Sequence, residues 1–370
     1  MEKGFLISSL YIMISLVSIL LFSHNNKELQ NSLFLSNKTK ISLEKIFLIA
    51  LLFVFFNFLT TKISGGFGYD RSNYLIEYNG IRESNSIILD LLFAYFNKFN
   101  LTFELFLYFT TFITVFLVLI AYRKSQFSDY KLWMLLLSSE FIFSSLSAIK
   151  QIYASAFASI FFVILLENNK KTVKCLLLAT ISSLFHISGL ILFPILLLNT
   201  IKKINKTFLI IILVIGIFFM FNFYYVLAVI SQLITPIFPQ YGTKITNYIE
   251  DFYNDSSYNI FSFIKYLPMY YISILGLIKR KRYSVKIPNY NKYLIISLIN
   301  SFLVLSSLYI YWFSRFGLIF YFPVFQFFNL IINADKSKKN KTFNFCMVFS
   351  LGYVILIRKI ITMFINYGML

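Results

Sequence analysis

The sequence contains few of the residues on which soluble or disulfide-stabilised folds depend. Of its 370 residues only 13% are charged, 15 are acidic and two are cysteine. A soluble domain usually carries about 25% charged residues, so a water-soluble fold is excluded. Because Cys175 and Cys346 are the only cysteines, neither a disulfide framework nor a thiolate metal site is expected. The scarcity of charge indicates a membrane protein.

Long apolar runs occupy most of the chain, which is 58% hydrophobic with a mean hydropathy of +0.74. Runs of about 20 residues recur from end to end and do not alternate with polar residues as transmembrane β-strands do. Helices must therefore cross the membrane, and we predict an all-α, polytopic fold. The predicted single spans are 5–23, 46–62, 103–122, 132–148, 151–166, 207–229, 261–278, 293–311, 316–333 and 343–363.

Lys and Arg residues cluster in short segments between the apolar runs. Six such segments hold 23 of the 34 basic residues, and the positive-inside rule places them in the cytoplasm. The net charge of +19 thus reflects topology, and no nucleic-acid partner is expected. Two outer segments, 63–102 and 230–260, are too long to be simple connections and are candidates for function. With no internal repeat, residues 1–370 are interpreted as one transmembrane domain.

The stretch 174–198 would normally count as one helix of about 25 residues. Lysines flank it on both sides, so both of its ends should lie in the cytoplasm. A single crossing cannot satisfy this, and Gly189 and Pro194 favour a break in the middle. We therefore predict a short hairpin with His186 at its tip, which brings the total to about twelve helices and points to a polar site at the tip.

Ionisable residues within the apolar zone are candidate site residues, because each costs at least a few kcal/mol there. Four stand out: Glu140, Lys150, His186 and Arg315. Lys150 could instead have a purely structural role, as an interfacial lysine that snorkels to the membrane surface. His186 could likewise be a core histidine whose hydrogen bonds are satisfied within the protein. Glu140 could pair with a cation or serve only as a hydrogen-bond acceptor. Outside the membrane, the segment 69–74 could present a carboxylate and an aromatic face to a sugar, or be an ordinary solvated loop.

Four short motifs resemble those of the EpsG family and the Wzy-type O-antigen and capsule polymerases. The family's Tyr-Asp-x-x-x-Tyr element is matched by residues 69–74. Its cation-Gln pair is matched by Lys150 and Gln151, although the family usually has Arg at the first position. A Phe-His-x-Ser-small element is matched by residues 185–189, and a late Arg followed by an aromatic pair is matched by Arg315 and Tyr321. The motifs follow in family order over most of the chain.

The resemblance implies a GT-C-like membrane glycosyltransferase. It would join oligosaccharide repeat units carried on undecaprenyl diphosphate into O-antigen, capsule or exopolysaccharide, with its site on the outer face of the bacterial cytoplasmic membrane. The implied partners are the lipid-linked glycan donor and acceptor, the bilayer and a chain-length regulator. No cofactor is implied, and no DxD-like element indicates a metal.

This chemistry needs a cation to stabilise the departing diphosphate and a base for the attacking hydroxyl. Arg315 and Lys150 fit the first role. Either His186 or Asp70 fits the second, with His186 favoured because the reference pKa of imidazole is about 6.5, while Asp70 would then bind the sugar or orient the acceptor. The other predicted substrate-binding residues are Tyr69, Arg71, Tyr74, Glu140, Gln151 and Tyr321.

Two other functions share several of these features. A lipid-linked oligosaccharide flippase would also have about twelve helices, but it should show two similar halves and cations deep in several central helices. A membrane O-acetyltransferase of the same pathway should place a His or Arg pair on the cytoplasmic side for acyl-CoA, where His24 is the only histidine.

Overall fold

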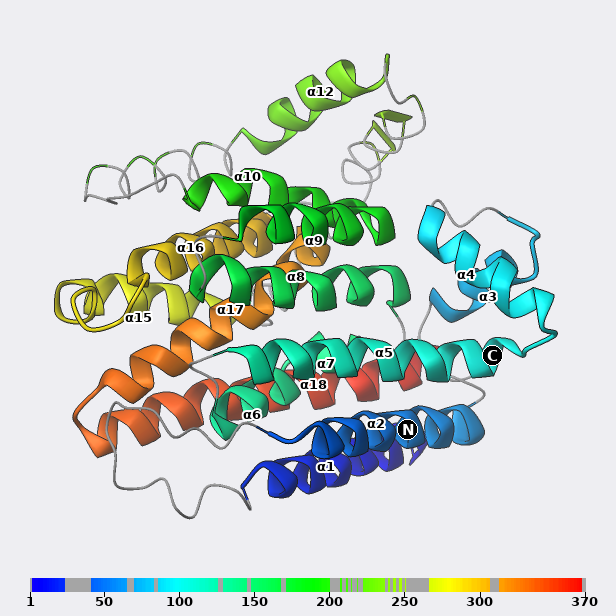
Figure 1. The fold of residues 1–370 in the computed structure, drawn as a ribbon, viewed down its shortest axis with the longest axis horizontal. Coiled ribbons are helices and arrows are strands. Elements are labelled where there is room, and N and C mark those ends of the chain that lie inside the picture. The colour runs from blue at the N-terminus through cyan, green and yellow to red at the C-terminus, as the bar shows by residue number, and fades with distance from the viewer. Residues whose placement is uncertain are drawn as a thin grey trace. The chain divides into compact units, whose positions relative to one another are not determined.

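Figure 1 shows the computed structural model of the chain. It describes residues 2–23, 41–64, 70–82, 86–125, 129–144, 148–167, 171–199, 222–236, 266–306 and 313–367, with scattered residues between 207 and 250. Every regular element in these ranges is helical, which confirms the all-α prediction. The helices are α1 (Glu2–Ser23), α2 (Leu43–Ser64), α3 (Asp70–Tyr78), α4 (Ile87–Lys98), α5 (Phe103–Lys124), α6 (Tyr130–Ser138), α7 (Glu140–Phe143), α8 (Ile149–Glu167), α9 (Thr172–Phe185), α10 (Leu192–Leu196), α12 (Phe223–Ile234), α15 (Leu267–Tyr283), α16 (Tyr290–Ser306), α17 (Phe313–Ala334) and α18 (Lys338–Tyr367), with the 3-10 turns η2 (Ile187–Ile191) and η3 (Leu197–Asn199).

Six of the described helices are long and apolar enough to cross a membrane: α1, α2, α5, α8, α17 and α18. Each coincides with a predicted span, and α15 and α16 cover most of two more. The described residues contain fifteen α-helices, three more than the twelve expected from the sequence. Two of the additional helices, α3 and α4, lie in the outer segment 63–102, and the third arises because the span 132–148 is divided into α6 and α7. The span 207–229 and the segment 230–260 lie largely outside the described residues. The GT-C-like architecture stays a prediction.

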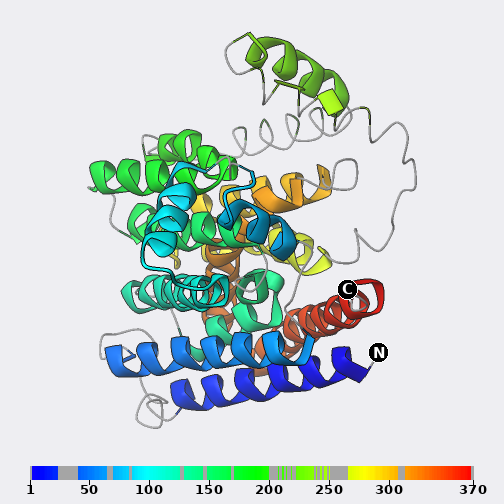
Figure 2. The ribbon, with the colours of Figure 1, turned by 90° about the vertical axis from the view of Figure 1, so that its right-hand side faces the viewer.

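The chain divides into two compact units, residues 1–196 with 332–370 and residues 197–331. In the first unit, α2 packs between α1 and α5, α8 packs between α5 and α9, and α6 and α18 pack against α1 (Figures 1 and 2). In the second unit, α15 packs against α16, and Gly276 of α15 allows the ring of Phe327 from α17 to approach closely. The single membrane domain expected from the sequence stays a prediction.

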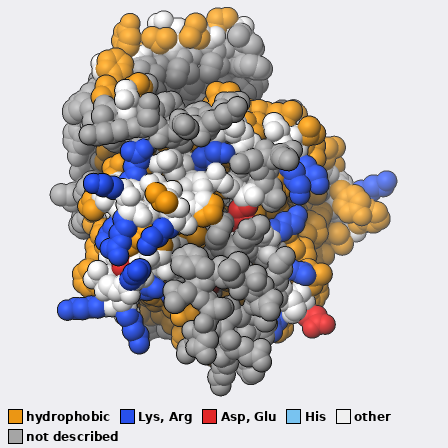
Figure 3. All heavy atoms as spheres, turned by 60° about the vertical axis from the view of Figure 1, so that its left-hand side comes forward, with side chains coloured by type: hydrophobic (Ala, Val, Ile, Leu, Met, Phe, Trp, Pro, Cys, Tyr) orange, Lys and Arg blue, Asp and Glu red, His pale blue; other side chains and the backbone are white. Residues whose placement is uncertain are grey.

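Basic residues lie at helix ends, where the topology argument places them. The last turn of α5 contains Arg123 and Lys124, and the last turn of α15 contains Arg280, Lys281 and Arg282. Figure 3 shows Lys and Arg side chains far outnumbering Asp and Glu on the face in view. Cations at helix C-termini also compensate the negative end of the helix dipole.

The predicted span 132–148 is broken at Ser139, whose backbone is extended between α6 and α7. The Phe141 amide donates to the Ser139 hydroxyl oxygen (3.2 Å), and the Leu137 carbonyl accepts from the hydroxyl of Tyr11 on α1 (2.8 Å). Tyr11 is fully buried, so the polar backbone exposed by the break is satisfied by protein rather than by water. Glu140, expected in mid-span, is instead the first residue of α7, and its side chain lies outside the described residues.

The chain reverses direction at His186, as the hairpin prediction requires. α9 ends at Phe185, His186 is extended (φ −155°, ψ 138°), and η2 and α10 return along α9. A Cβ atom at Gly189 would lie 2.5 Å from the backbone of Ser182 and Ser183, so only glycine permits this approach. The hairpin is therefore fixed by backbone packing at its tip.

Candidate functional site

From Asp70 onward, the predicted Tyr-Asp-x-x-x-Tyr segment belongs to the short helix α3 rather than to a loop. Its last turn closes with a Schellman motif, in which Gly80 adopts φ +72° and the amides of Gly80 and Ile81 donate to the carbonyls of Glu77 and Ile76 (both 3.1 Å). This turn brings Arg82 back toward Glu77. Glu77 lies three residues after Tyr74 and hence on the same face of α3.

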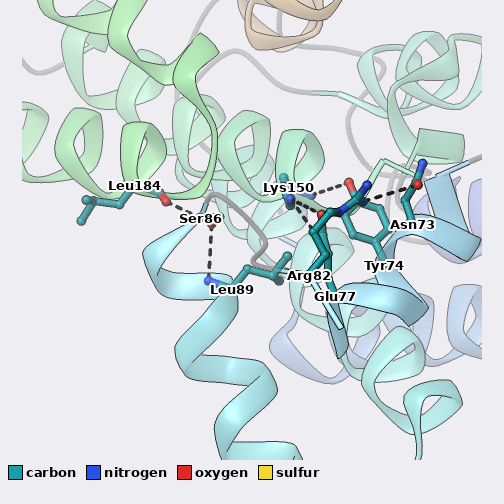
Figure 4. A network of polar contacts seen from close by, with 8 residues as sticks. All are labelled: Asn73, Tyr74, Glu77, Arg82, Ser86, Leu89, Lys150 and Leu184. Carbon is teal, nitrogen blue, oxygen red and sulfur yellow. Dashed lines mark hydrogen bonds and ion pairs between the residues drawn. The ribbon is translucent and has the colours of Figure 1, made fainter. Parts of the chain in front are cut away.

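Glu77 is the centre of a charged network that joins α3 to the start of α8 (Figure 4). The Lys150 ammonium donates to Glu77 Oε1 (3.1 Å) and lies 3.0 Å from Oε2. Arg82 Nη2 lies 3.2 Å from Glu77 Oε1 and 3.4 Å from the side-chain oxygen of Asn73. The ring of Tyr74 lies beneath the Lys150 ammonium, 5.5 Å from ring centroid to nitrogen. One carboxylate therefore holds two cations beside an aromatic ring.

The members of this network differ sharply in exposure. The Glu77 side chain is 5% exposed and that of Lys150 is 16% exposed, whereas that of Arg82 is 51% exposed. Asp90 of α4 also acts electrostatically on Lys150. Sequence reasoning placed Lys150 and Tyr74 in the site but did not assign Glu77 or Arg82 to it. The three-residue spacing from Tyr74 to Glu77 could have indicated that Glu77 lies on the same face as Tyr74. That inference requires α3 to be predicted as a helix.

Arg71, predicted to bind substrate, has protein partners in this structure. Its guanidinium lies 3.5 Å from Glu104 at the start of α5, donates to the Thr61 hydroxyl on α2 (3.3 Å) and lies over the ring of Phe103. Burial lowers the pKa of Arg71, and the Glu104 carboxylate opposes this shift. Arg71 thus fastens α3 to the ends of two long helices, and its contact with substrate stays a prediction.

Three further contacts fix α3 and α4 at the same end of the first unit. The Tyr78 hydroxyl donates to the Leu101 carbonyl (2.6 Å), and the Asn97 amide donates to the Tyr78 carbonyl (2.8 Å). Ser86 caps α4 by accepting from the Leu89 amide, and its hydroxyl donates to the Leu184 carbonyl at the end of α9 (3.2 Å; Figure 4). The outer segment is thereby attached to the hairpin two residues before His186.

The hairpin packs on the first turns of α8, next to the cation-Gln pair. Phe185 stacks on Tyr153, with ring centroids 4.5 Å apart, and the Ser182 hydroxyl donates to the Ala154 carbonyl (2.9 Å). The small residues that follow Gln151 let the two helices approach this closely. Gln151 itself is 4% exposed. The structure therefore brings Tyr74, Lys150, Gln151 and His186 to one end of the first unit.

His186 is half-buried and its ring faces its own chain. The backbone amide of Ser188 donates to His186 Nδ1 (3.1 Å), and the Ser188 hydroxyl lies 2.8 Å from the same nitrogen. This contact makes His186 the N-cap of η2.

The remaining predicted site residues belong to the second unit or lie, in whole or in part, outside the described residues. Arg315 and Tyr321 lie on α17 in the second unit, where Arg315 is half-buried and Tyr321 is buried with its ring edge-on to Phe325. Asp70 is the first residue of α3, but its side chain lies outside the described residues, as does all of Tyr69. Within the described ranges, no three His, Cys, Asp or Glu side chains are grouped so that they could hold a metal ion.

The apolar helices and the polar cluster at their ends define a polytopic helical membrane protein. The chain belongs to the EpsG family, whose family model matches residues 45–369. This confirms the resemblance drawn from the four short motifs. No curated protein and no solved structure matches the chain significantly.

Proposed function

We propose that this protein polymerises undecaprenyl-diphosphate-linked oligosaccharide repeat units into O-antigen, capsule or exopolysaccharide on the outer face of the bacterial cytoplasmic membrane. The family match over residues 45–369 carries this proposal, because the EpsG family is associated with Wzy-type polymerases of membrane polysaccharide biosynthesis. The partners would be the lipid-linked donor and acceptor within the bilayer, with a chain-length regulator as a further partner.

In the proposed reaction, a sugar hydroxyl of a new lipid-linked unit attacks the anomeric carbon of the growing chain. A glycosidic C–O bond forms, the C–O bond to the diphosphate breaks, and lipid diphosphate leaves with its electron pair. The hydroxyl proton passes to a base. The barrier is lowered by cations that stabilise the departing diphosphate and by a base near the hydroxyl.

Lys150 and Arg315 are the proposed diphosphate contacts. Lys150 lies in the first turn of a membrane-length helix, and it would act as a point charge rather than as the bidentate fork of an arginine. Asp70 and His186 are the candidates for the base. Binding of the sugars is assigned to Tyr69, Tyr74, Arg71, Gln151, Glu140 and Tyr321. The burial of Tyr74 and Gln151 beside Lys150 supports their part in one site.

The test is complementation of a deletion of this gene in its native host, with the surface-glycan ladder read on a gel. The variants are wild type, Arg315→Ala, Lys150→Ala and the control Lys98→Ala, whose side chain is exposed in the last turn of α4. Immunoblotting of membranes matches the expression levels. We expect wild type and the control to restore the ladder and the other two variants to leave single repeat units.

Two outcomes would replace the proposal with one of its alternatives. If the deletion removes all surface glycan, including the single repeat unit, a lipid-linked oligosaccharide flippase is favoured. If the deletion leaves the ladder intact but changes its acetylation, a membrane O-acetyltransferase is favoured.

A further inference from the structure

We infer that α4 is an amphipathic helix embedded in the boundary of the bilayer, with its exposed apolar side in contact with lipid acyl chains. The occupant of this face is the bilayer itself. The sequence places the segment 63–102, which contains α4, outside the membrane. Nothing in the new placement depends on the proposed polymerase activity.

The side chains of α4 form distinct stripes along the helix. Leu89, Phe93 and Phe96 are buried against the rest of the protein. Asp90 and Asn97 are polar and exposed, and they follow one another at helical spacing on a second side. These two stripes alone would describe an ordinary surface helix, with one side in the protein and one side in water.

A third stripe of α4 is both apolar and exposed. Its members recur every four residues and continue into the residue that caps the helix, so they share one face. They are Ile87 (66% exposed), Leu91 (66%), Tyr95 (58%) and Phe99 (55%). A continuous apolar face of this kind marks a surface that contacts a membrane or another protein.

The contacts of the buried stripe fix the depth of α4 along α5. Helix α5 is long and apolar enough to cross a membrane, and its 22 residues measure about 33 Å, close to the hydrocarbon core of about 30 Å. The ring of Phe106 lies 4.9 Å from that of Phe93 and 5.3 Å from that of Phe96. The ring of Phe96 also lies 5.5 Å from that of Phe109. Phe106 and Phe109 are about 4.5 Å and 9 Å along the axis from Phe103, so α4 packs beside the first two turns of α5.

The exposed residues of α5 identify the solvent at this depth. Leu105 and Phe109 are 45% and 38% exposed, and exposed apolar side chains in a membrane-length helix face lipid. The charged pair of Arg71 and Glu104 marks the polar boundary at the start of the same helix. Because the apolar stripe of α4 is exposed beside these turns, it meets the same lipid.

The length and composition of α4 favour a helix that lies in the membrane boundary. Twelve residues measure about 18 Å, which is too short to cross the bilayer. Interfacial helices insert an apolar face by about 5–10 Å and keep polar side chains on the opposite side. Asp90, Asn97 and Lys98 supply the polar side chains, and Tyr95 is of the type that collects at membrane interfaces.

This placement also sets the depth of the charged network. Asp90, on the polar side of α4, acts electrostatically on Lys150. The Asn97 amide, on the same side, donates to the Tyr78 carbonyl at the end of α3 (2.8 Å). With α4 in the membrane boundary, the ion pair between Glu77 and Lys150 lies at the level of the lipid headgroups.

Site-directed spin labelling in nanodiscs tests the placement. Cys175→Ala and Cys346→Ser remove both native cysteines, and a label is then attached at one new cysteine at a time. Oxygen concentrates in lipid, whereas a polar nickel chelate stays in water. We expect the ratio of oxygen to nickel accessibility to be several-fold higher at Leu91→Cys and Tyr95→Cys than at the neighbouring control Asp90→Cys.

Three results of the labelling would overturn the inference. Nickel accessibility as high at Leu91→Cys as at Asp90→Cys would show that water covers the apolar stripe. Low accessibility to both reagents at Leu91→Cys would show that protein covers it. Dipolar broadening of the spectrum at the same label would identify that protein as a second copy of the chain.

Hydrogen–deuterium exchange in nanodiscs gives a second measurement without a label. Leu91→Lys should speed exchange of the α4 amides by about tenfold to hundredfold, which corresponds to the loss of one buried apolar side chain. The control Lys98→Ala, at an exposed position of the same helix, should leave exchange unchanged. On a water-covered stripe Leu91→Lys would be nearly neutral, so exchange equal to that of the wild type would overturn the inference.

Discussion

Replacing Glu77 should loosen the attachment of α3 to α8 more than any other single change in the charged network. The Lys150 ammonium lies 3.0 Å and 3.1 Å from the two Glu77 oxygens, and both side chains are largely buried. Two unit charges at this distance attract by roughly 5 kcal/mol at an effective dielectric constant of about 20. Removing one partner of a buried pair typically costs about 3–5 kcal/mol, because the other charge remains desolvated.

The expected cost for Glu77→Gln is about 2–3 kcal/mol, below that range because Lys150 retains some solvent contact. Lys150→Met should cost less than Glu77→Gln, because Arg82 still neutralises the Glu77 carboxylate. The double variant should cost less than the sum of the single variants by about 2 kcal/mol, because a buried pair replaced as a whole leaves no isolated charge.

Hydrogen–deuterium exchange of the α3 amides, followed by mass spectrometry of protein in nanodiscs, measures this local opening. A cost of 2 kcal/mol corresponds to roughly 30-fold faster exchange. Arg82→Met is the matched control. Its side chain is half exposed, so its pair with Glu77 should contribute only about 0.2–1 kcal/mol. Additivity of Glu77→Gln and Lys150→Met within about 0.5 kcal/mol would refute the argument that the two charges stabilise each other.

Two further changes test the parts of the fold that position the site. Gly189→Ala should lower the unfolding free energy by about 1–3 kcal/mol, because the added methyl would lie 2.5 Å from the α9 backbone. The melting temperature in detergent, followed by intrinsic fluorescence, should therefore fall. An unchanged melting temperature would contradict the packing of η2 on α9. Tyr11→Phe should lower the unfolding free energy by about 1–3 kcal/mol, because the buried Leu137 carbonyl would lose its hydrogen-bond donor. Tyr95→Phe, at an exposed position, should leave the melting temperature unchanged. Equal melting temperatures for both variants would argue against the role of Tyr11 at the helix break.

The hairpin shows how far local sequence information reaches. Lysines on both sides of 174–198 required an even number of crossings, and Gly189 marked the position of the reversal. Both signals are local, so the prediction succeeded. The break at Ser139 had no such signal, because residues 132–148 contain neither glycine nor proline. It is stabilised by the hydroxyl of Tyr11, more than 120 residues earlier in the chain, and no local pattern reveals that partner.

The sequence by itself determined the helical class, the positions of most spans and the family, since hydropathy, charge placement and short motifs are properties of contiguous residues. Only the tertiary structure decided how the charged side chains are used. Glu77 meets Lys150 across 73 positions, and Arg71 of α3 meets Glu104 of α5 with the whole of α4 between them in the sequence. The capping role of His186 likewise depends on an amide that points at one ring nitrogen, which is a matter of backbone direction. In the low dielectric of a helical bundle, such pairings set which groups remain available for chemistry, and they are fixed by packing between segments that are distant in sequence.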